Sequence, residues 1–244
     1  MESISFDRIA ERYDETRGGT DRAHDLAAGI APVLAPGSVL EVGVGTGTVA
    51  AALTGQGRDV VGIDLSPEML RRAVDRLGSR VAVGDAQRLP VRSGVCDNVV
   101  LAWVLHVVGD PVATLVEARR VLADGGRVVI APRAVTPPVQ FDDVETIYYA
   151  MYSMLRPEDD LEPTSVVSTA EAAGLVLVDR TLAGSRDVGE SPLASAQRIE
   201  SRTFSSLWDL DEDTWVTVVE PAIAQLRALP DADRPRTRSV TQEL

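Results

Sequence analysis

SVLEVGVGTGTVAAAL, residues 38–53, joins a short apolar run to a glycine-rich turn and then to a run rich in alanine. The apolar run predicts a buried strand at 38–42, and the second run predicts a helix at 48–54. Glycines between the two runs allow the backbone to turn tightly and allow a ligand to approach it closely. A strand, a glycine turn and a helix in this order are typical of an α/β domain.

The same alternation continues on the C-terminal side of this stretch. Apolar runs and helix signals predict strands at 59–63, 81–83, 97–103 and 127–131, with helices at 66–77 and 112–122. Short apolar strands that alternate with helices indicate a parallel sheet covered on both faces, and such sheets bind ligands at the carboxyl ends of their strands. We therefore predict a Rossmann-like, doubly wound α/β fold with a helical cap.

The flanking segments complete the predicted fold. Helices are expected at 4–17, 21–34, 144–155, 169–173 and 211–229. Two more strands, at 175–182 and near 202–207, would bring the mostly parallel sheet to seven strands. The expected organisation is one domain with N-terminal cap helices (1–36), a core (37–133), a cap insertion (134–165), C-terminal strands and helix (166–229) and a mobile tail (230–244).

Composition bounds the class of function. The chain has 244 residues, 45% of them hydrophobic, and a net charge of −13. A surface with this much negative charge repels phosphate backbones, so we expect a small molecule as the partner and no nucleic acid. Apolar runs are too short to span a bilayer and the N-terminus lacks a signal-peptide layout, so a cytoplasmic location is expected. The single cysteine, Cys96, excludes an internal disulfide and a metal cluster built from cysteines.

Three acidic residues stand at the ends of three successive predicted strands. Glu41 precedes the glycine turn by two residues, Asp64 ends the second strand, and Asp85 follows the third. A carboxylate at the end of the second strand can accept both hydroxyls of a ribose. An acceptor after the third strand can take the exocyclic amine of an adenine. Together with the glycine turn, these acids predict a site for an adenosine-containing cofactor.

The glycine turn by itself leaves a nicotinamide dinucleotide open. The G-x-G-x-x-G fingerprint, counted from Gly43, should close at Thr48 and fails there. Counted from Gly45, it closes at Ala50, which satisfies the looser form that ends in alanine. The acid at Glu41 favours a different cofactor.

Five segments in order resemble a known family. They are VLEVGVGTG (39–47), GIDLSPEML (62–70), GDAQRLP (84–90), CDNVVLAWVLHVV (96–108) and RRVLADGGRVVI (119–130). Together they are similar to the core of the class I S-adenosylmethionine-dependent methyltransferases, in the branch that includes the ubiquinone and menaquinone C-methyltransferases. FDRIAERYD (6–14) resembles the helix that precedes this core in that branch. The resemblance implies S-adenosylmethionine as cofactor and S-adenosylhomocysteine as product.

The resemblance also implies roles for residues around the methionine end of the cofactor. Gly43 and Gly45 would approach the methionine moiety, and Glu41 would orient the loop or bind the methionine ammonium. The backbone of Ala102, at the end of the fourth predicted strand, would face the amino-acid end.

For the nucleoside, the resemblance implies that Asp64 binds the ribose. Leu65 and Met69 would flank the adenine, while Asp85 and Ala86 would contact its edge.

The N-terminal helix and the loop after the fourth strand carry further implied roles. Tyr13 and Arg17 would close the cofactor in. The family often has paired histidines after the fourth strand, where this chain has His106-Val107. His106 is the candidate general base, because its free pKa lies near neutrality; the alternative is a partly buried histidine that closes a helix or loop.

Candidate acceptor contacts follow the core. Tyr148, Tyr149 and Tyr152 share one predicted helix and could form an apolar lid over the acceptor, or else pack as the core of a cap helix. Trp103 could form a wall of the pocket, with core packing as the alternative. The acidic residues at 142, 143 and 145 lack an accompanying histidine and are expected to be a solvated face, so no metal site is predicted.

We therefore expect an enzyme that moves a methyl group from S-adenosylmethionine to an O, N or C atom of a small, partly apolar metabolite. Two alternatives remain open: a nicotinamide-dependent oxidoreductase and a non-catalytic protein that binds S-adenosylmethionine. A relative of the fold that uses the sulfonium for another reaction is also compatible with the sequence. The acceptor and the oligomeric state are not determined by these patterns.

Overall fold

A computed structural model describes residues 6–16, 19–132, 142–155 and 163–244. The chain divides into two compact units. The sheet unit comprises residues 1–135, 161–185 and 241–244, and the helical unit comprises residues 136–160 and 186–240. The sequence predicts one domain in which residues 134–165 form a cap insertion; by contacts, residues 186–240 group with residues 136–160.

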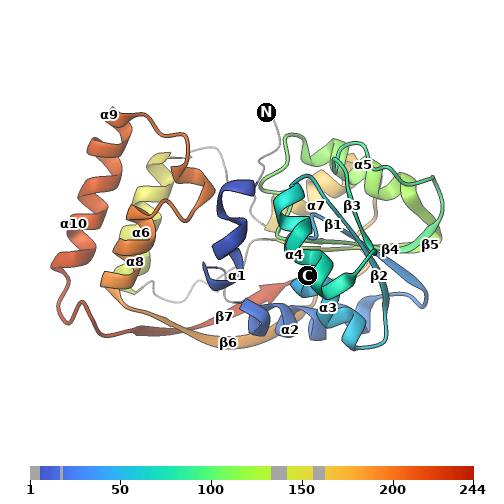
Figure 1. The fold of residues 1–244 in the computed structure, drawn as a ribbon, viewed down its shortest axis with the longest axis horizontal. Helices are drawn as coiled ribbons and strands as arrows, with labels where there is room; N and C mark the ends of the chain where they lie inside the picture. The colour runs from blue at the N-terminus through green and yellow to red at the C-terminus, as the bar shows by residue number, and fades with distance from the viewer. Residues whose placement is uncertain (1–5, 17–18, 133–141, 156–162) are drawn as a thin grey trace. The chain divides into compact units, whose positions relative to one another are not determined.

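The sheet unit is built on five parallel strands in the order β3-β2-β1-β4-β5 (Figure 1). They are β1 (Ser38–Val42), β2 (Asp59–Asp64), β3 (Val81–Val83), β4 (Cys96–Ala102) and β5 (Leu122–Ala131). These are the five strands that the core sequence predicts: β1 and β3 have the predicted bounds, β2 and β4 differ by one residue, and β5 begins five residues early. The strand order reverses between β1 and β4, and ligands of doubly wound sheets bind outside the carboxyl ends of the strands at such a point.

Helices cover both faces of this sheet. α2 (Gly19–Ile30), α3 (Thr48–Gly55) and α4 (Pro67–Leu77) share one apolar core with the strand residues on their side, among them Val39. α5 (Pro111–Val121) and α7 (Pro163–Ala172) share the other core, which includes Leu40 and Val42. Because successive strand residues point to opposite faces, the alternation along β1 accounts for both layers. The predicted doubly wound α/β architecture is confirmed.

Helix caps follow the sequence signals. Ser66 precedes α4, and its hydroxyl accepts a hydrogen bond from the Met69 amide at 3.1 Å. Asp110 caps α5 in the same way, through the Ala113 amide at 2.9 Å. A proline follows each cap at the first helical position, where its missing N–H costs no hydrogen bond.

The N-terminal segment is less regular than expected. A single helix at 4–17 is predicted, but the described residues form a 3₁₀ helix, η1 (Asp7–Arg12), followed by one α-helical turn, α1 (Tyr13–Thr16). The second predicted helix ends earlier than expected, because the chain continues from α2 into the 3₁₀ turn η2 (Ala31–Val33).

The helical unit holds α6 (Asp143–Leu155), α8 (Pro192–Glu200), η3 (Ser205–Leu207), α9 (Glu212–Thr214), the π-helical turn η4 (Trp215–Val219) and α10 (Glu220–Ala228). Its core is formed by Met151, Ile199, Leu207 and Leu226, together with smaller apolar side chains. The π turn ends at Val219, two residues before Pro221, which lacks the N–H that a regular helix needs. The predicted terminal helix is therefore interrupted at this point.

Two strands, β6 (Leu182–Glu190) and β7 (Arg236–Glu243), form a separate two-stranded sheet. The predicted seven-stranded sheet is therefore wrong for the described residues, because neither strand joins the parallel sheet. The predicted strand at 175–182 is also wrong: residues 175–181 have no regular structure, and Val176 and Val178 are 82% and 83% exposed. An apolar run favours a strand, but only pairing with a neighbouring strand makes one.

Two more expectations at the C-terminal end are corrected. The strand expected near 202–207 is a turn followed by η3, and the expected mobile tail at 230–244 contains β7. Backbone hydrogen bonds between Thr181 and Leu244, at 2.8 and 3.1 Å, extend the pairing beyond the two strands. Among the described residues, no helix is long and apolar enough to cross a membrane.

Candidate functional site

Glu41 is a buried acid near the carboxyl end of β1. It pairs with Gly62 of β2 and Val100 of β4 and is 2% exposed. Burial raises the pKa of its carboxyl to about 8; the nearby Asp64 carboxylate acts in the same direction, and the Ala50 amide opposes both. Within the described residues, the Oε2 atom has no hydrogen-bond partner. A ligand that donates a hydrogen bond to this buried oxygen, or that places a positive charge beside it, would therefore be bound favourably.

The glycine turn that follows Glu41 uses its glycines for two different reasons. Gly43 has φ +72°, and a Cβ on it would lie 2.3 Å from Cγ2 of Val104, so packing requires a glycine here. Gly45 has φ +56°, and a Cβ there would meet nothing within 4 Å. The turn is therefore closed at Gly43 and open at Gly45, where a ligand can approach the backbone.

Asp64 ties the end of β2 to the glycine turn. Its Oδ2 accepts a hydrogen bond from the Gly45 amide at 2.8 Å, and its Oδ1 accepts one from the Ser66 amide at 2.8 Å. Burial raises the pKa of Asp64, and the amides of Ser66, Gly45 and Leu65 oppose that shift. Two carboxylate oxygens offer about four acceptor positions, so capacity remains for the hydroxyls of a ribose.

Asp85 lies in the turn after β3, directly after Gly84, whose amide is hydrogen-bonded to Asp64. The Gly84 amide donates to the Asp64 carbonyl at 2.9 Å, which places the ends of β2 and β3 together. The Asp85 side chain is half-buried and accepts a hydrogen bond from the Gln87 amide at 2.9 Å. The structure thus brings the three predicted acids to neighbouring strand ends.

The remaining cofactor-contact candidates lie around these acids. Leu65 follows Asp64 and is 38% exposed, whereas Met69, on the first turn of α4, is 2% exposed. Ala86 is partly buried against the α5 side of the sheet, and Ala102 is buried at the end of β4. Their contacts with a cofactor stay predictions.

The N-terminal segment is held against this site by two aspartates that the sequence analysis did not single out. Asp14 accepts a hydrogen bond from the Thr46 hydroxyl at 2.5 Å and forms an ion pair with Arg76 at 2.7 Å. Arg76 also donates to the Thr46 carbonyl at 2.7 Å. Asp7 accepts hydrogen bonds from the Ser66 hydroxyl and from the Glu68 amide, the latter at 3.3 Å. These pairs join residues about 30 to 60 positions apart, and no sequence spacing marks them.

Of the two N-terminal residues expected to close in the cofactor, the structure describes one. Tyr13 packs edge-to-face against Phe6, with ring centroids 5.9 Å apart. Arg17 lies outside the described residues.

The loop after β4 carries the candidate base. His106 is half-buried and lies in the turn that follows Trp103 and Val104. Val104 packs against Gly43, so this loop touches the glycine turn directly. Histidine in such a position can exchange a proton with a bound ligand, and its catalytic role stays a prediction. His24, on α2, is exposed.

The three tyrosines expected at the acceptor lie on α6, in the helical unit. Tyr148 stacks on Tyr152 with centroids 6.1 Å apart and meets Phe204 edge-on at 5.4 Å, so it contributes to the core of that unit. Tyr149 is 52% exposed. The carboxylates described above belong to the sheet unit, and acceptor contacts from α6 stay predictions.

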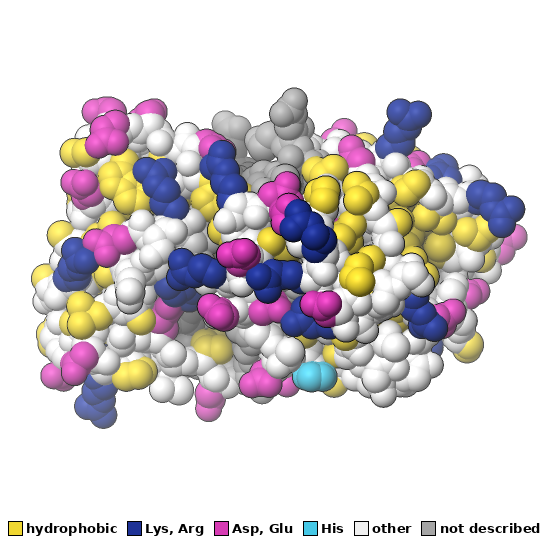
Figure 2. All heavy atoms as spheres, viewed as in Figure 1, with side chains coloured by type: hydrophobic (Ala, Val, Ile, Leu, Met, Phe, Trp, Pro, Cys, Tyr) yellow, Lys and Arg dark blue, Asp and Glu magenta, His cyan; other side chains and the backbone are white. Residues whose placement is uncertain are grey.

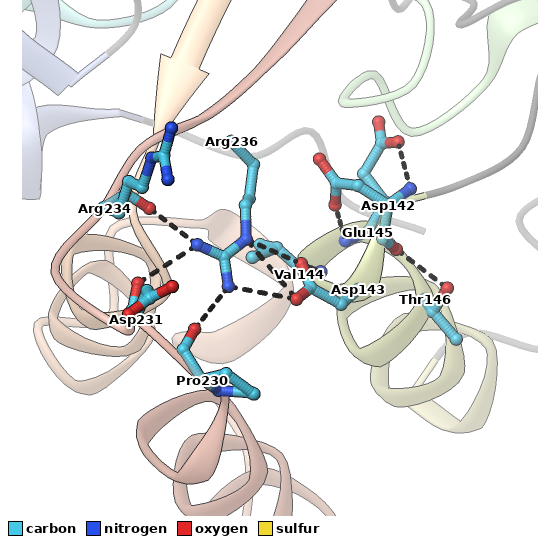
Figure 3. Close-up of polar contacts among 9 residues, drawn as sticks. All are labelled: Asp142, Asp143, Val144, Glu145, Thr146, Pro230, Asp231, Arg234 and Arg236. Carbon is cyan, nitrogen blue, oxygen red and sulfur yellow. Dashed lines mark hydrogen bonds and ion pairs between the residues drawn. The ribbon is translucent and has the colours of Figure 1, made fainter.

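The acidic residues at the start of α6 make structural hydrogen bonds. Asp143 accepts from the Arg236 guanidinium, which also donates to the carbonyls of Pro230, Asp231 and Arg234 (Figure 3). Asp142 accepts a hydrogen bond from the Glu145 amide at 2.7 Å. In the part of the chain that the structure describes, no group of three or more His, Cys, Asp or Glu side chains could hold a metal ion.

The strand order and the acids together define a class of protein. A doubly wound sheet with an open glycine turn after β1, and with acidic side chains at three adjacent strand ends, has the features of a nucleoside-cofactor-binding domain. Residues 40–130 match the family described as methyltransferase domain. This segment of the chain is therefore similar to a methyltransferase domain, in agreement with its resemblance to the class I family.

Methyltransferases are also found among the individual proteins that this chain resembles. The chain is 38% identical over 149 residues to a demethylmenaquinone methyltransferase of Beutenbergia cavernae, covering 59% of this chain and 62% of that one. It is 28% identical over 237 residues to an arsenite methyltransferase of Halobacterium salinarum, covering 91% and 56%. The chain thus spans about three fifths of the length of the relatives it matches.

A solved structure shares the fold. It is a methyltransferase of Thermotoga maritima that uses S-adenosylmethionine and is described as a possible histamine N-methyltransferase. The TM-score is 0.55 at 17% identity, over 98% of this chain and 96% of that one.

Proposed function

We propose that this chain is an enzyme that transfers the methyl group of S-adenosylmethionine to an O, N or C atom of a small, partly apolar metabolite. The observation that carries the proposal is the buried Oε2 of Glu41, which has no hydrogen-bond partner among the described residues and belongs to a carboxyl close enough to Asp64 for their charges to interact. S-adenosylmethionine carries an ammonium group, which is a donor that Oε2 of Glu41 lacks, and two ribose hydroxyls, for which the Asp64 carboxylate keeps acceptor capacity beside its bonds to the Gly45 and Ser66 amides. The matching methyltransferase domain at 40–130 supports the same cofactor.

The chain's own residues would bind and orient this cofactor. Asp64 would accept the ribose hydroxyls while it holds the Gly45 amide. Glu41 would accept hydrogen bonds from the ammonium, and it would release its proton on binding because a nearby positive charge favours the carboxylate. The sulfonium supplies an activated methyl group for in-line displacement, so the remaining demand on the protein is alignment in a dry site.

The acceptor side of the proposal rests on fewer observations. His106 would take the proton of the acceptor at a ring nitrogen, with the loop after β4 held against the glycine turn through Val104. We keep the tyrosines of α6 as proposed acceptor contacts, of which Tyr149 is the most exposed. Relatives that act on a quinone precursor and on arsenite support a small acceptor.

A small acceptor also agrees with the surface charge. Figure 2 shows arginine side chains scattered among aspartates and glutamates on the face drawn. Nucleic-acid binding proteins gather their basic residues into a patch or stripe that follows the phosphates. With a net charge of −13 and this mixture, a polyanionic substrate would be repelled.

A calorimetric titration of the purified chain tests the cofactor. We expect saturable binding of S-adenosylhomocysteine and no heat from NAD in a parallel cell. The reverse pattern would support a nicotinamide-dependent oxidoreductase instead, as the looser glycine fingerprint allows. Formation of S-adenosylhomocysteine from S-adenosylmethionine in a screen of acceptors then separates an enzyme from a non-catalytic binding protein.

A further inference from the structure

Trp103 adopts a backbone conformation that a tryptophan rarely takes. It directly follows Ala102, the last residue of β4, and its φ is +58°. A bulky residue in the left-handed region is strained, and such strain persists only where the surrounding structure holds it in place. Backbone strain of this kind gathers at binding and catalytic sites, and here it lies at the strand end where doubly wound sheets bind ligands.

Contacts from separate segments hold Trp103 in this conformation. Its amide donates to the Ala131 carbonyl at 2.9 Å, at the end of β5. Its indole Nε1 donates to Oε1 of Gln242 on β7 at 2.8 Å, and Nε2 of Gln242 donates to the Pro132 carbonyl at 2.7 Å. The Arg22 guanidinium on α2 lies over the ring, 3.7 Å from its centroid.

Gln242 is the side chain that links two of these contacts. It is 8% exposed, and its amide group bridges the Trp103 indole and the backbone that follows β5. Because the donor and the acceptor of one amide are both used, an apolar replacement would leave an indole N–H and a carbonyl without these partners.

The conformation of Trp103 sets the course of the next residues. Val104 follows at once and packs its Cγ2 onto Gly43, so closely that a Cβ there would be 2.3 Å away. Within the glycine turn, the Gly45 amide donates a hydrogen bond to Asp64. A change in the backbone at Trp103 would therefore shift Val104, which is in van der Waals contact with the glycine turn, and so would alter the turn directly.

We infer that Gln242 is a positioning residue for the proposed cofactor site: it holds Trp103 in the left-handed conformation, so that Val104 supports the glycine turn. The inference rests on the proposed function, since S-adenosylhomocysteine is the probe. The indole N–H of Trp103 is bound to Gln242 and one ring face is covered by Arg22, while its part as a wall of the acceptor pocket stays a prediction.

The test compares Gln242→Met and Trp103→Phe, singly and together. Methionine keeps the length of glutamine without its hydrogen bonds, and phenylalanine keeps a ring for Arg22 without the indole N–H. Each single variant should bind S-adenosylhomocysteine about threefold to tenfold more weakly in calorimetry. The double variant should be no weaker than the weaker single one, because both changes break the same link. Gln225→Met, on an exposed position of α10, is the matched control and should bind normally.

Thermal unfolding separates positioning from stability. If Gln242→Met lowers the unfolding midpoint but leaves the affinity unchanged, Gln242 is merely structural and the inference is overturned. Effects that multiply in the double variant overturn it as well. Should Gln242→Met fail to fold, Trp103→Phe decides alone: normal affinity in that variant contradicts the inference. If the unchanged chain does not bind S-adenosylhomocysteine, the proposed function fails and the inference fails with it.

Discussion

Asp14 and Arg76 form an ion pair of 2.7 Å that joins the N-terminal segment to α4. Both side chains also bind Thr46, which lies between two glycines of the turn and is 1% exposed. The turn is therefore held from outside by a segment that begins more than 30 residues earlier. Since a cofactor at this turn would lie beside these contacts, the ion pair should affect its retention.

Asp14→Ala should weaken binding of S-adenosylhomocysteine by about threefold to tenfold, because it removes a hydrogen bond and an ion pair from the glycine turn. Asp14→Asn keeps an acceptor for Thr46 and should lose less. Calorimetry at low and high salt checks the ionic part, since salt screens partly exposed pairs. Asp25→Asn, on the exposed side of α2, is the control. Equal affinity for the alanine variant and the unchanged chain would show that the N-terminal segment does not support the site.

Glu41 predicts an unusual dependence of stability on pH. Its pKa is raised from 4.5 to about 8, so between these values the folded state holds a proton that the unfolded state has lost. Its contribution to the free energy of unfolding is fully present below pH 4.5 and falls as pH rises to about 8. The expected slope is at most about 1.4 kcal/mol per pH unit.

Glu41→Gln should remove this slope, because glutamine does not titrate. Urea denaturation of both proteins from pH 5 to 8.5 gives the difference in unfolding free energy, in which the contributions of other groups cancel. We expect the variant to gain stability over the unchanged chain as pH rises, while its affinity for S-adenosylhomocysteine falls. A difference that does not vary with pH would mean that Glu41 is ionised in the folded chain.

Asp64→Ala should weaken binding of S-adenosylhomocysteine by roughly tenfold or more, because two ribose hydroxyls lose their acceptor and the Gly45 amide loses its partner. Calorimetric titration measures the change. Asp59→Ala, at the exposed start of the same strand, should bind normally. An unaltered affinity for Asp64→Ala would move the ribose to another place.

His106→Ala should lower turnover by on the order of a hundredfold and spare cofactor affinity, if its ring takes the proton of the acceptor. The measurement is the rate of S-adenosylhomocysteine formation with an acceptor found by screening. The chain has two histidines, so His24→Ala is the natural control. Turnover equal to that of the unchanged chain would make His106 a structural residue.

Arg236→Gln should lower the thermal midpoint by several degrees, because its guanidinium joins Asp143 at the start of α6 to three carbonyls near the start of β7 (Figure 3). Arg236 also holds the pKa of Asp143 below its ordinary value, so the pair loses its contribution as pH falls through that lowered pKa. The midpoint of the variant should accordingly depend less on pH in acid. Arg234→Gln, whose side chain is exposed, serves for comparison. Identical melting curves would show that the Arg236 hydrogen bonds do not stabilise the helical unit.

Some residues of the candidate site could be predicted from local sequence patterns, whereas others are placed by contacts between distant segments. Glu41, Asp64 and Asp85 could be predicted because each lies at or beside the carboxyl end of a short apolar strand, and parallel strand ends meet at one edge of a sheet. Asp7 and Asp14 could not, since an aspartate in an amphipathic segment looks the same whether it faces water or a distant hydroxyl. Gln242 carries no sequence signal either, because its partner Trp103 lies 139 residues away.

The sequence by itself determined the five parallel strands, their helices and the similarity of residues 40–130 to a methyltransferase domain, because apolar periodicity, caps and glycine turns are local properties. Only the tertiary structure decided which residues of the C-terminal part form strands and how these strands pair. Whether the apolar run at 175–182 becomes a strand depends on a neighbour to pair with, and the chain instead pairs residues 182–190 with 236–243. Pairing between distant segments depends on the free energy of the whole chain, and no short stretch of sequence contains it.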